Sequence, residues 1–252
     1  MKVLGKLFGL FDKKEKQLLS KFEKTKLENL SKKINISFHD SILFAKALTH
    51  RSYLEKNTNL TKSNERLEFL GDAVLGLVVA DILFKNFPQE DEGFLTKTRS
   101  HIVDKQGLLQ AASRLNLIEY ILYDERFIKK SQKGIESILA DSMEALIGAI
   151  YLDVGIETTK RFIEKWITDP SLKSGEYQID NNFKGQLLEY THAEKLSSPN
   201  YILISSKGPD HNKEFIVEVQ INDVNYGYGR GKNKKAAEQK AAKAALSILK
   251  AK

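Results

Sequence analysis

Residues 64–79, NERLEFLGDAVLGLVV, are the most informative segment of the chain. Within them the acids Glu65, Glu68 and Asp72 recur at spacings of three and four, which predicts an α-helix that carries all three on one face. From Ala73 onward nearly every position is apolar, a pattern typical of a helix buried at the centre of a bundle. Because an unpaired buried carboxylate is costly, we expect these acids to have a partner.

A second apolar stretch, ILADSMEALIGAIYL at residues 138–152, carries Asp141 and Glu144 three residues apart. Two such helices can face one another, and four converging anions need a multivalent cation to stay ionised. The chain has no Cys, which excludes thiolate-bound zinc and iron–sulfur clusters. Oxygen ligands favour Mg²⁺, with Mn²⁺ as a plausible substitute, and such a site suits metal-assisted phosphodiester hydrolysis. The alternative is that the acids are structural, with Glu65 paired to an Arg and Asp141 capping its helix.

The first 165 residues have apolar positions at spacings of three and four, which predicts an all-α domain. The segment that follows, DPSLKSGEYQIDNN, loses this periodicity and gathers Asp, Pro, Ser, Gly and Asn, as linkers do. We therefore expect an N-terminal extension (1–15), a helical domain (16–168), a linker (169–181) and a C-terminal domain (182–252). The predicted helices of the first domain lie near residues 16–33, 40–50, 64–86, 92–103, 105–115, 132–154 and 156–167.

In the C-terminal domain the apolar period changes to two. Residues 201–206, 214–221 and 224–231 are predicted strands, between a helix near 183–195 and a closing helix. The closing helix carries one apolar stripe, formed by Ala237, Ala241, Ala244 and Ile248. The order αβββα predicts a small α+β domain in which two helices cover one face of a three-stranded antiparallel sheet.

The charge is distributed unevenly along the chain. The formal net charge is +7, which suggests a polyanionic partner. Residues 1–34 hold ten Lys against four acids, and residues 182–252 hold 12 basic residues against seven acids, so the region between them is net acidic. The acidic middle contains the carboxylate pairs and the basic end contains the predicted α+β domain.

Membrane association is not expected. The longest apolar run, residues 73–84, includes Asp81 and is well below the roughly 20 residues that a spanning helix needs. The opening MKVLGKLFGLF is interrupted by Lys6 and is followed by no cleavage site of small residues, unlike a signal peptide. We expect a cytoplasmic, soluble protein without a membrane partner.

Lysines gather at the start of the closing helix, where Lys232, Lys234 and Lys235 precede an alanine-rich stretch. A helix N-terminus already attracts phosphate through its dipole and free N–H groups. Together with the turn GPDH at residues 208–211, this arrangement suits the recognition of A-form RNA by its shape. The alternative is a solvated, lysine-rich terminal helix.

Several of these segments together resemble bacterial ribonuclease III: NERLEFLGD (64–72), DEG (91–93), ADSMEALIG (140–148), THRSY (49–53) and the GPDH…KNKKAAEQKAA pattern. The resemblance extends over roughly residues 16–250. It implies a homodimeric, Mg²⁺-dependent endonuclease that cuts double-stranded RNA, leaves 5′-phosphate and 3′-hydroxyl ends with short 3′ overhangs, and takes part in rRNA and mRNA processing.

The resemblance also implies roles for individual residues. Metal ligands would be Glu68, Asp72, Asp141 and Glu144, of which Asp72 and Glu144 are most often called catalytic. Acids near the RNA and the dimer interface would be Glu65 and Glu92, and Phe69 would fill a cavity in the partner subunit. RNA contacts would come from Pro209, His211, Lys232, Lys234, Lys235 and Glu189, although Leu188 stands where many family members have Gln, with Gln186 as a weak substitute.

Two other functions remain open at this point. A double-stranded RNA-binding scaffold without catalysis would keep the C-terminal domain but has no need of four intact acids. A metal phosphohydrolase acting on a small nucleotide would use the acids but leaves the basic domain unexplained.

Overall fold

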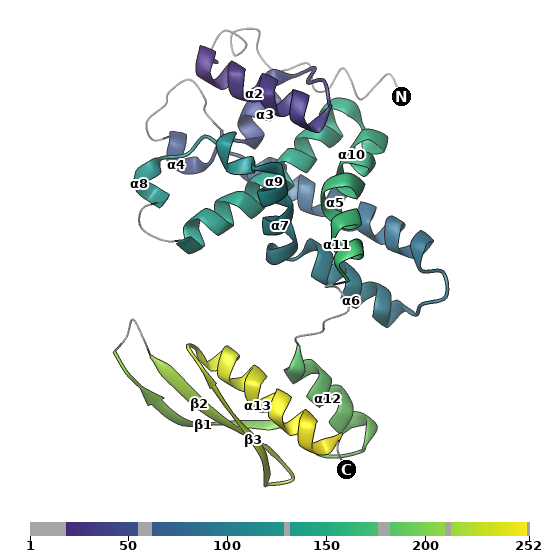
Figure 1. Ribbon diagram of the computed structural model, residues 1–252, viewed down its shortest axis with the longest axis vertical. Helices are drawn as coiled ribbons and strands as arrows, with labels where there is room; N and C mark the ends of the chain where they lie inside the picture. Colours follow the sequence, from purple (N-terminus) through teal and green to yellow (C-terminus); the bar gives the residue numbers. More distant parts are fainter. Residues whose placement is uncertain (1–18, 55–61, 129–131, 176–181, 210–212, 251–252) are drawn as a thin grey trace. The chain divides into compact units, whose positions relative to one another are not determined.

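In the computed structural model, residues 19–54, 62–128, 132–175, 182–209 and 213–250 are described (Figure 1). The chain divides into two compact units, Met1–Gln178 and Ile179–Lys252. The expected N-terminal extension (1–15) and the candidate His211 lie outside the described residues.

The first unit is helical throughout its described part, as predicted. Three predicted helices have the expected bounds: α6 (Glu92–Val103), α7 (Lys105–Leu115) and α9 (Gln132–Val154). The central helix, α5 (Glu65–Asn86), also lies where residues 64–79 predict it. The other helical segments of this unit are α2 (Lys21–Ile34), α3 (Ser41–Ala47), α4 (Arg51–Leu54), η2 (Leu117–Glu119), α8 (Glu125–Ile128), α10 (Ile156–Ile163), the π-helical turn η3 (Glu164–Thr168) and α11 (Asp169–Ser174).

Side-chain caps decide where the first helices begin. The Ser20 hydroxyl accepts a hydrogen bond from the Glu23 N–H at 3.2 Å, and the Ser20 N–H donates to the Glu23 carboxylate at 2.7 Å. This reciprocal capping box starts α2 at Lys21, and residues 16–18 of the predicted helix lie outside the described residues. Asp40 caps α3 by accepting from the N–H groups of Ile42 and Leu43.

The segment predicted as a linker from residue 169 begins instead with α11. Pro170 lies in its first turn, where a helix tolerates the missing N–H, so the Asp-Pro-Ser sequence does not break the helix. Ser171 is buried, Leu172 packs against the core of the unit, and the helix ends at Gly175 with a φ of 69°. The helical unit therefore extends past residue 168.

The core of the helical unit is built around α5 and α9, which pack along one another (Figure 1). Leu75 and Val79 of α5 and Leu146 and Ile150 of α9 are completely buried. The prediction that α5 is buried nearly all round is wrong for the single chain. Its neighbours leave one stripe uncovered, so that Phe69, Leu77 and Phe84 are 81%, 67% and 71% exposed.

The second unit has the predicted αβββα order. Its elements are α12 (Phe183–Ala193), β1 (Asn200–Lys207), β2 (Glu214–Ile221), β3 (Val224–Gly231) and α13 (Lys234–Leu249). The strands form an antiparallel sheet in the order β1-β2-β3, with Tyr201 opposite Val219 and Phe215 opposite Gly231. Asn222 and Asp223, both with positive φ, make the tight turn between β2 and β3.

Both helices of the second unit share a core with one face of the sheet (Figure 1). The Lys184 ammonium lies 2.6 Å from the Glu238 carboxylate and so ties α12 to α13. The predicted stripe on α13 is wrong at its end, because Ile248 is 46% exposed. The buried face is rotated slightly from the prediction and includes Ala242, Ala245 and Leu249.

No described helix is both long and apolar enough to span a bilayer.

Candidate metal centre and nucleic-acid surface

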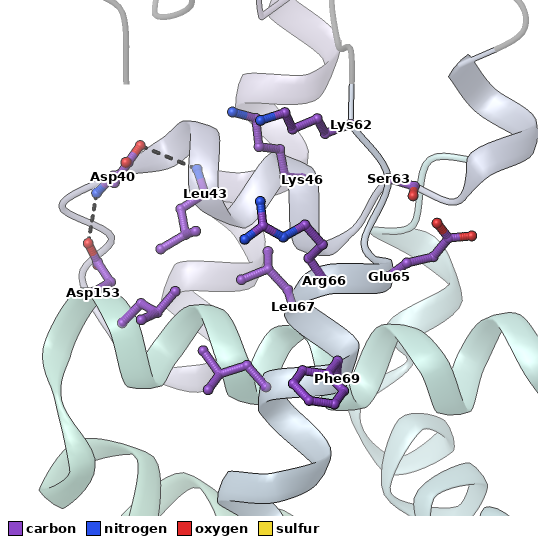
Figure 2. A pocket seen from close by; sticks show the side chains of 12 residues that line it. Asp40, Leu43, Lys46, Lys62, Ser63, Glu65, Arg66, Leu67, Phe69 and Asp153 are labelled. Atoms are coloured by element: carbon purple, nitrogen blue, oxygen red, sulfur yellow. Dashed lines mark hydrogen bonds between the residues drawn. The ribbon is translucent and has the colours of Figure 1, made fainter. Parts of the chain in front are cut away.

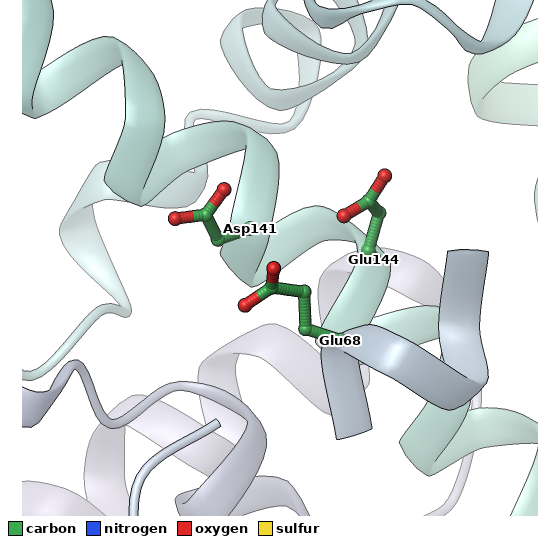
Figure 3. A group of neighbouring side chains, drawn as sticks. All are labelled: Glu68, Asp141 and Glu144. Atoms are coloured by element: carbon green, nitrogen blue, oxygen red, sulfur yellow. The ribbon is translucent and has the colours of Figure 1, made fainter. Parts of the chain in front are cut away.

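Three of the predicted acids converge where α5 meets α9. Glu68 extends from α5, and Asp141 and Glu144 extend from α9, toward a common point (Figure 3). One carboxylate oxygen of each lies within 4.8 Å of those of the other two, and all three side chains are partly buried. Oxygen atoms are the donors that hard divalent cations prefer, so the group fits such an ion.

A close approach of the two helix backbones brings these acids together. A Cβ added to Gly71 would strike the Glu144 carbonyl, and one added to Gly148 would strike the Leu67 carbonyl. Glycine is unfavourable within a helix, so these two residues are explained by the close crossing that they permit. They are the signal in the sequence for how Glu68 is placed against Glu144, and the spacing of the acids alone does not contain it.

The electrostatics of the group favour protons in the absence of a cation. Burial, with the charges of Asp72 and Glu68, raises the pKa of Glu144 to about 7. Burial, followed by the charge of Asp141, also raises the pKa of Glu68. Burial raises the pKa of Asp141, although the positive charges of Lys105 and Arg51 oppose that rise. A bound divalent cation would offset the repulsion between the carboxylates, which contributes to the raised pKa values of Glu68 and Glu144.

Asp72 lies outside this group of three. It follows Glu68 by one helical turn on α5 and is exposed. Its charge nevertheless contributes to the raised pKa of Glu144, so it lies close to the group. The purely structural alternative is wrong for Asp141, which lies well inside α9 and therefore cannot cap it.

Glu65 and Glu92 are both exposed and do not join the group of three acids. Glu65 begins α5. Glu92 lies in the first turn of α6, where its carboxylate accepts a hydrogen bond from the Thr96 hydroxyl at 2.9 Å. It also lines a pocket of about 390 Å³ with Leu77 and Phe84, two exposed residues of the α5 stripe.

Phe69 lies on the exposed stripe, beside a larger cavity of about 740 Å³ (Figure 2). Leu43, Leu70 and Leu152 give this cavity an apolar interior, while its other lining side chains are mostly charged. An exposed aromatic next to an open apolar cavity is the arrangement that two copies of one chain can satisfy reciprocally.

The candidate RNA-binding residues of the second unit are exposed wherever they are described. Lys232, Lys234 and Lys235 surround Asn233, whose side chain accepts from the Ala236 N–H at 2.8 Å and caps α13. The first turn of this helix contains no acid, so nothing in it offsets the lysine charges. Pro209, just after β1, is also exposed, as are Glu189 and Leu188 on α12.

A second pocket of about 390 Å³ is lined by Arg51, Asn64 and Ser137. Arg51 and Asn64 belong to the motifs THRSY and NERLEFLGD, but the sequence predicts no role for any of the three. This pocket shares Glu68 and Asp141 with the group of three acids. Sequence spacing gives no signal for such neighbours, because three separate segments of the chain supply them.

Both units match known families. Residues 40–171 match the model described as Ribonuclease-III-like, and residues 183–249 match the double-stranded RNA binding motif. Curated relatives named Ribonuclease 3 include one from a Nitratiruptor species, 41% identical over 89% of this chain and 97% of its own length. Another, from Geobacillus kaustophilus, is 40% identical over 94% of this chain and 97% of its own.

A solved structure supports the assignment of the helical unit. The nuclease domain of ribonuclease III from Campylobacter jejuni, studied for flexibility in a region involved in dimer formation, is 41% identical, with a TM-score of 0.50. The match covers 56% of this chain and 97% of that domain. With these matches, the chain belongs to the bacterial ribonuclease III family, as an endoribonuclease with a helical nuclease domain followed by a double-stranded RNA-binding domain.

Proposed function

We propose that this protein hydrolyses double-stranded RNA with Mg²⁺, for which Mn²⁺ can substitute, and leaves 5′-phosphate and 3′-hydroxyl ends. The observation that carries the proposal is the convergence of Glu68, Asp141 and Glu144 within 4.8 Å on two crossing helices. With Asp72 as a fourth ligand, these acids form the metal site, and Asp72 and Glu144 are the catalytic residues.

When bound, the divalent cation supplies an activated water and neutralises charge on the scissile phosphate. The chain itself supplies a fixed frame of carboxylates on two helices. Because Gly71 and Gly148 permit the close crossing of α5 and α9, the backbones that carry Glu68 and Glu144 lie at a fixed, short separation. The acids must be ionised to bind the cation, so metal binding and loss of the Glu144 proton are coupled.

The second unit holds the duplex. Lys232, Lys234 and Lys235 contact phosphates at the start of α13, and the loop containing Pro209 and His211 enters the minor groove. Glu189 on α12 completes the surface, with the exposed Leu188 beside it. The exposure of the described members of this set and the acid-free first turn of α13 support this role.

We also propose a homodimer, in which Phe69 of each copy fills the 740 Å³ cavity of the other, with Glu65 and Glu92 near the interface and the RNA. Two metal sites related by a two-fold axis would then each cut one strand. The relatives are bacterial, and a bacterium holds its RNA in the cytoplasm. We therefore propose that location, with rRNA and mRNA precursors as substrates.

Gel analysis of a long RNA duplex, incubated with and without Mg²⁺ beside a DNA duplex of the same sequence, tests the activity. We expect Mg²⁺-dependent fragments from RNA alone, and none from the Glu144→Gln variant. Tight duplex binding without fragments would favour a non-catalytic scaffold. Hydrolysis of free nucleotides with the duplex left intact would favour a small-molecule phosphohydrolase. Full activity of Glu144→Gln would remove Glu144 from the catalytic site.

A further inference from the structure

The second 390 Å³ pocket adjoins the group of three acids, and Glu144 is not among its lining residues. It shares Glu68 and Asp141 with that group, and its other walls come from α4, the residue before α5 and the first turns of α9. Its lining residues are His50, Arg51, Asn64, Glu65, Glu68, Gly134, Ser137, Ile138 and Asp141. A ligand group bound between Glu68, Asp141 and Glu144 would therefore have this pocket as its immediate neighbour.

One cationic side chain lines this pocket and a second contacts one of its lining residues, although acids dominate the surroundings. Arg51 is exposed and lines the pocket directly. Lys105, at the start of α7, reaches the pocket through Ser137, because its ammonium donates to the Ser137 hydroxyl at 2.8 Å. Both act electrostatically on Asp141. The pocket therefore has positive charge, from two segments of the chain, next to the acids. This combination suits a ligand that has one group bound at the metal site and an anionic group directly beside it.

Asn64 supplies an independent observation. It lines the pocket, is only 2% exposed, and its side-chain Nδ2 has no hydrogen-bond partner among the described residues. It is the residue before α5, where Asn commonly caps a helix, yet its side chain makes no capping hydrogen bond. A buried amide donor is nearly always hydrogen-bonded in a folded protein, so an unpaired one beside a pocket indicates a ligand that completes it.

We propose that this pocket is a subsite for the nucleotide next to the cleaved phosphodiester, in which Arg51 and Lys105 hold its phosphate and Asn64 donates to an oxygen of the same nucleotide. The inference rests on the proposed function, because it places the cleaved phosphate at Glu68, Asp141 and Glu144. Duplex RNA presents phosphates in close succession along each strand, so the neighbouring phosphate must lie beside the acids. The chemistry required is that of a phosphodiester and an adjoining hydroxyl or phosphate oxygen, for which guanidinium, ammonium and amide donors are suitable.

The test combines protein variants with a neutralised phosphate. A short RNA duplex that is cut once in each strand is made with a methylphosphonate, which has no charge, at the position on either side of the cleaved bond of one strand, and cleavage of that strand is followed. Wild-type protein, Arg51→Gln and Lys105→Gln are compared in single-turnover cleavage with Mg²⁺. The control Lys173→Gln removes the same charge from α11, where Lys173 is exposed and does not line the pocket.

We expect Arg51→Gln to slow cleavage of the unmodified duplex by about 10- to 100-fold, the range for loss of a charge-assisted hydrogen bond. A methylphosphonate at one of the two neighbouring positions should slow the wild type similarly and slow Arg51→Gln no further. Lys105→Gln should show the same non-additivity with that position, and Lys173→Gln should not. Additive effects at both positions for Arg51 and Lys105 would overturn the subsite.

Binding provides a readout that does not depend on turnover. The affinity for the same duplexes is measured by fluorescence anisotropy in Ca²⁺, and the melting temperature of each variant is measured to verify folding. Arg51→Gln should bind the unmodified duplex more weakly than the wild type does, and the methylphosphonate should not lower its affinity further. Asn64→Asp, which replaces the donor by an acceptor of the same size, should also weaken binding. Unchanged affinity in both variants would contradict the proposal.

The two proposals fail in different ways. Absence of cleavage of any RNA duplex by the wild type would overturn the proposed function and the subsite with it. Cleavage by the wild type, together with additive effects of protein and phosphate changes, would overturn the subsite alone.

Discussion

At Glu144 burial and the charges of three neighbouring acids act in the same direction on one carboxyl group. The pKa of Glu144 is about 7, against 4.5 for an ordinary glutamate. Between these values the folded protein keeps a proton that the unfolded chain has lost. The free energy of unfolding therefore decreases as the pH rises from about 4.5 to about 7, and the decrease is complete above that range. Glu68 and Asp141, whose pKa values are also raised, contribute in the same direction.

Replacing Glu144 by Gln should reduce this loss of stability. Without divalent cations, we expect the melting temperature of the wild type to fall between pH 5 and pH 8, and that of Glu144→Gln to fall less. Thermal melts in EDTA across this range measure the difference. Glu157→Gln, an exposed acid on α10, is the matched control and should follow the wild type. Parallel curves of melting temperature against pH for Glu144→Gln and wild type would show that folding does not raise the pKa of Glu144.

At the scale of elements, the crossing of α5 and α9 determines the geometry of the site, and Gly71 tests it. In Gly71→Ala the new Cβ would meet the Glu144 carbonyl, so the helices must separate. We expect a loss of about 1–3 kcal/mol in the free energy of unfolding, as overpacking of a core costs. A wider gap between Glu68 and Glu144 should also weaken stabilisation by Mg²⁺. Chemical denaturation with and without Mg²⁺ measures both effects.

The same helix contains the control for this variant. Within one chain a Cβ at Gly76 would meet no atom within 4 Å, so Gly76→Ala raises helix propensity without separating α5 from α9. It should raise the free energy of unfolding by up to about 1 kcal/mol and leave the response to Mg²⁺ unchanged. If the two variants behaved alike, close approach at Gly71 would not be what holds the acids together.

The start of α13 carries the second prediction at this scale. In the double variant Lys234→Ala, Lys235→Ala, two exposed charges are lost from the first turn while helix propensity is kept. RNA affinity should fall, and the slope of log K against log salt should decrease by about 0.7–0.9 for each lost phosphate contact. Fluorescence anisotropy with an RNA duplex at several salt concentrations measures both quantities.

Two further lysines provide the comparison, since Lys240 and Lys250 belong to the same helix and its C-terminal cap, and both are exposed. The double variant Lys240→Ala, Lys250→Ala removes equal charge and should change affinity and slope much less. Equal effects of the two double variants would mean that net charge, and not the lysines of the first turn, governs RNA binding.

Sequence periodicity located most elements because helix and strand periods are local properties. The bounds of α6, α7 and α9 follow from apolar spacing and from caps such as Asp91 and Asp104. The failures have local causes too. The Asp-Pro-Ser composition predicts a linker at Pro170, although this residue occupies a helical first turn. The uniform apolarity of α5 does not show that one of its faces lacks a neighbour.

The site was predicted in part for the same reason. Spacing placed Asp141 and Glu144 on one face of α9 and Glu68 on one face of α5, and helix pairing did the rest. The spacing of the acids could not place Asp72. Whether this residue, one helical turn beyond Glu68, belongs to the group depends on how far along their length α5 and α9 stay in contact. The spacing could not find Arg51 or Lys105 either, since only the tertiary fold brings these segments to Asp141.

At the scale of the whole molecule, the exposed stripe of α5 leads to a prediction about assembly. Phe69 is 81% exposed and adjoins an apolar cavity that no described side chain of the same chain fills (Figure 2). A two-fold dimer in which each Phe69 enters the other copy would bury both aromatic rings and line up Leu77 and Phe84 along the same interface. The chain therefore should be dimeric at micromolar concentration.

Phe69→Ala should weaken that dimer by about 100- to 10,000-fold in Kd, because the variant dimer loses two buried rings and burial of each large apolar side chain contributes about 1.5–3 kcal/mol. Sedimentation equilibrium over a range of concentrations measures the change. Phe22→Ala is the control, since Phe22 is a similarly exposed phenylalanine on α2, away from the cavity, and its removal should leave the Kd unchanged. A monomeric wild type, or a Phe69→Ala variant that dimerises as strongly as the wild type, would exclude the reciprocal fit and leave the α5 stripe to another partner.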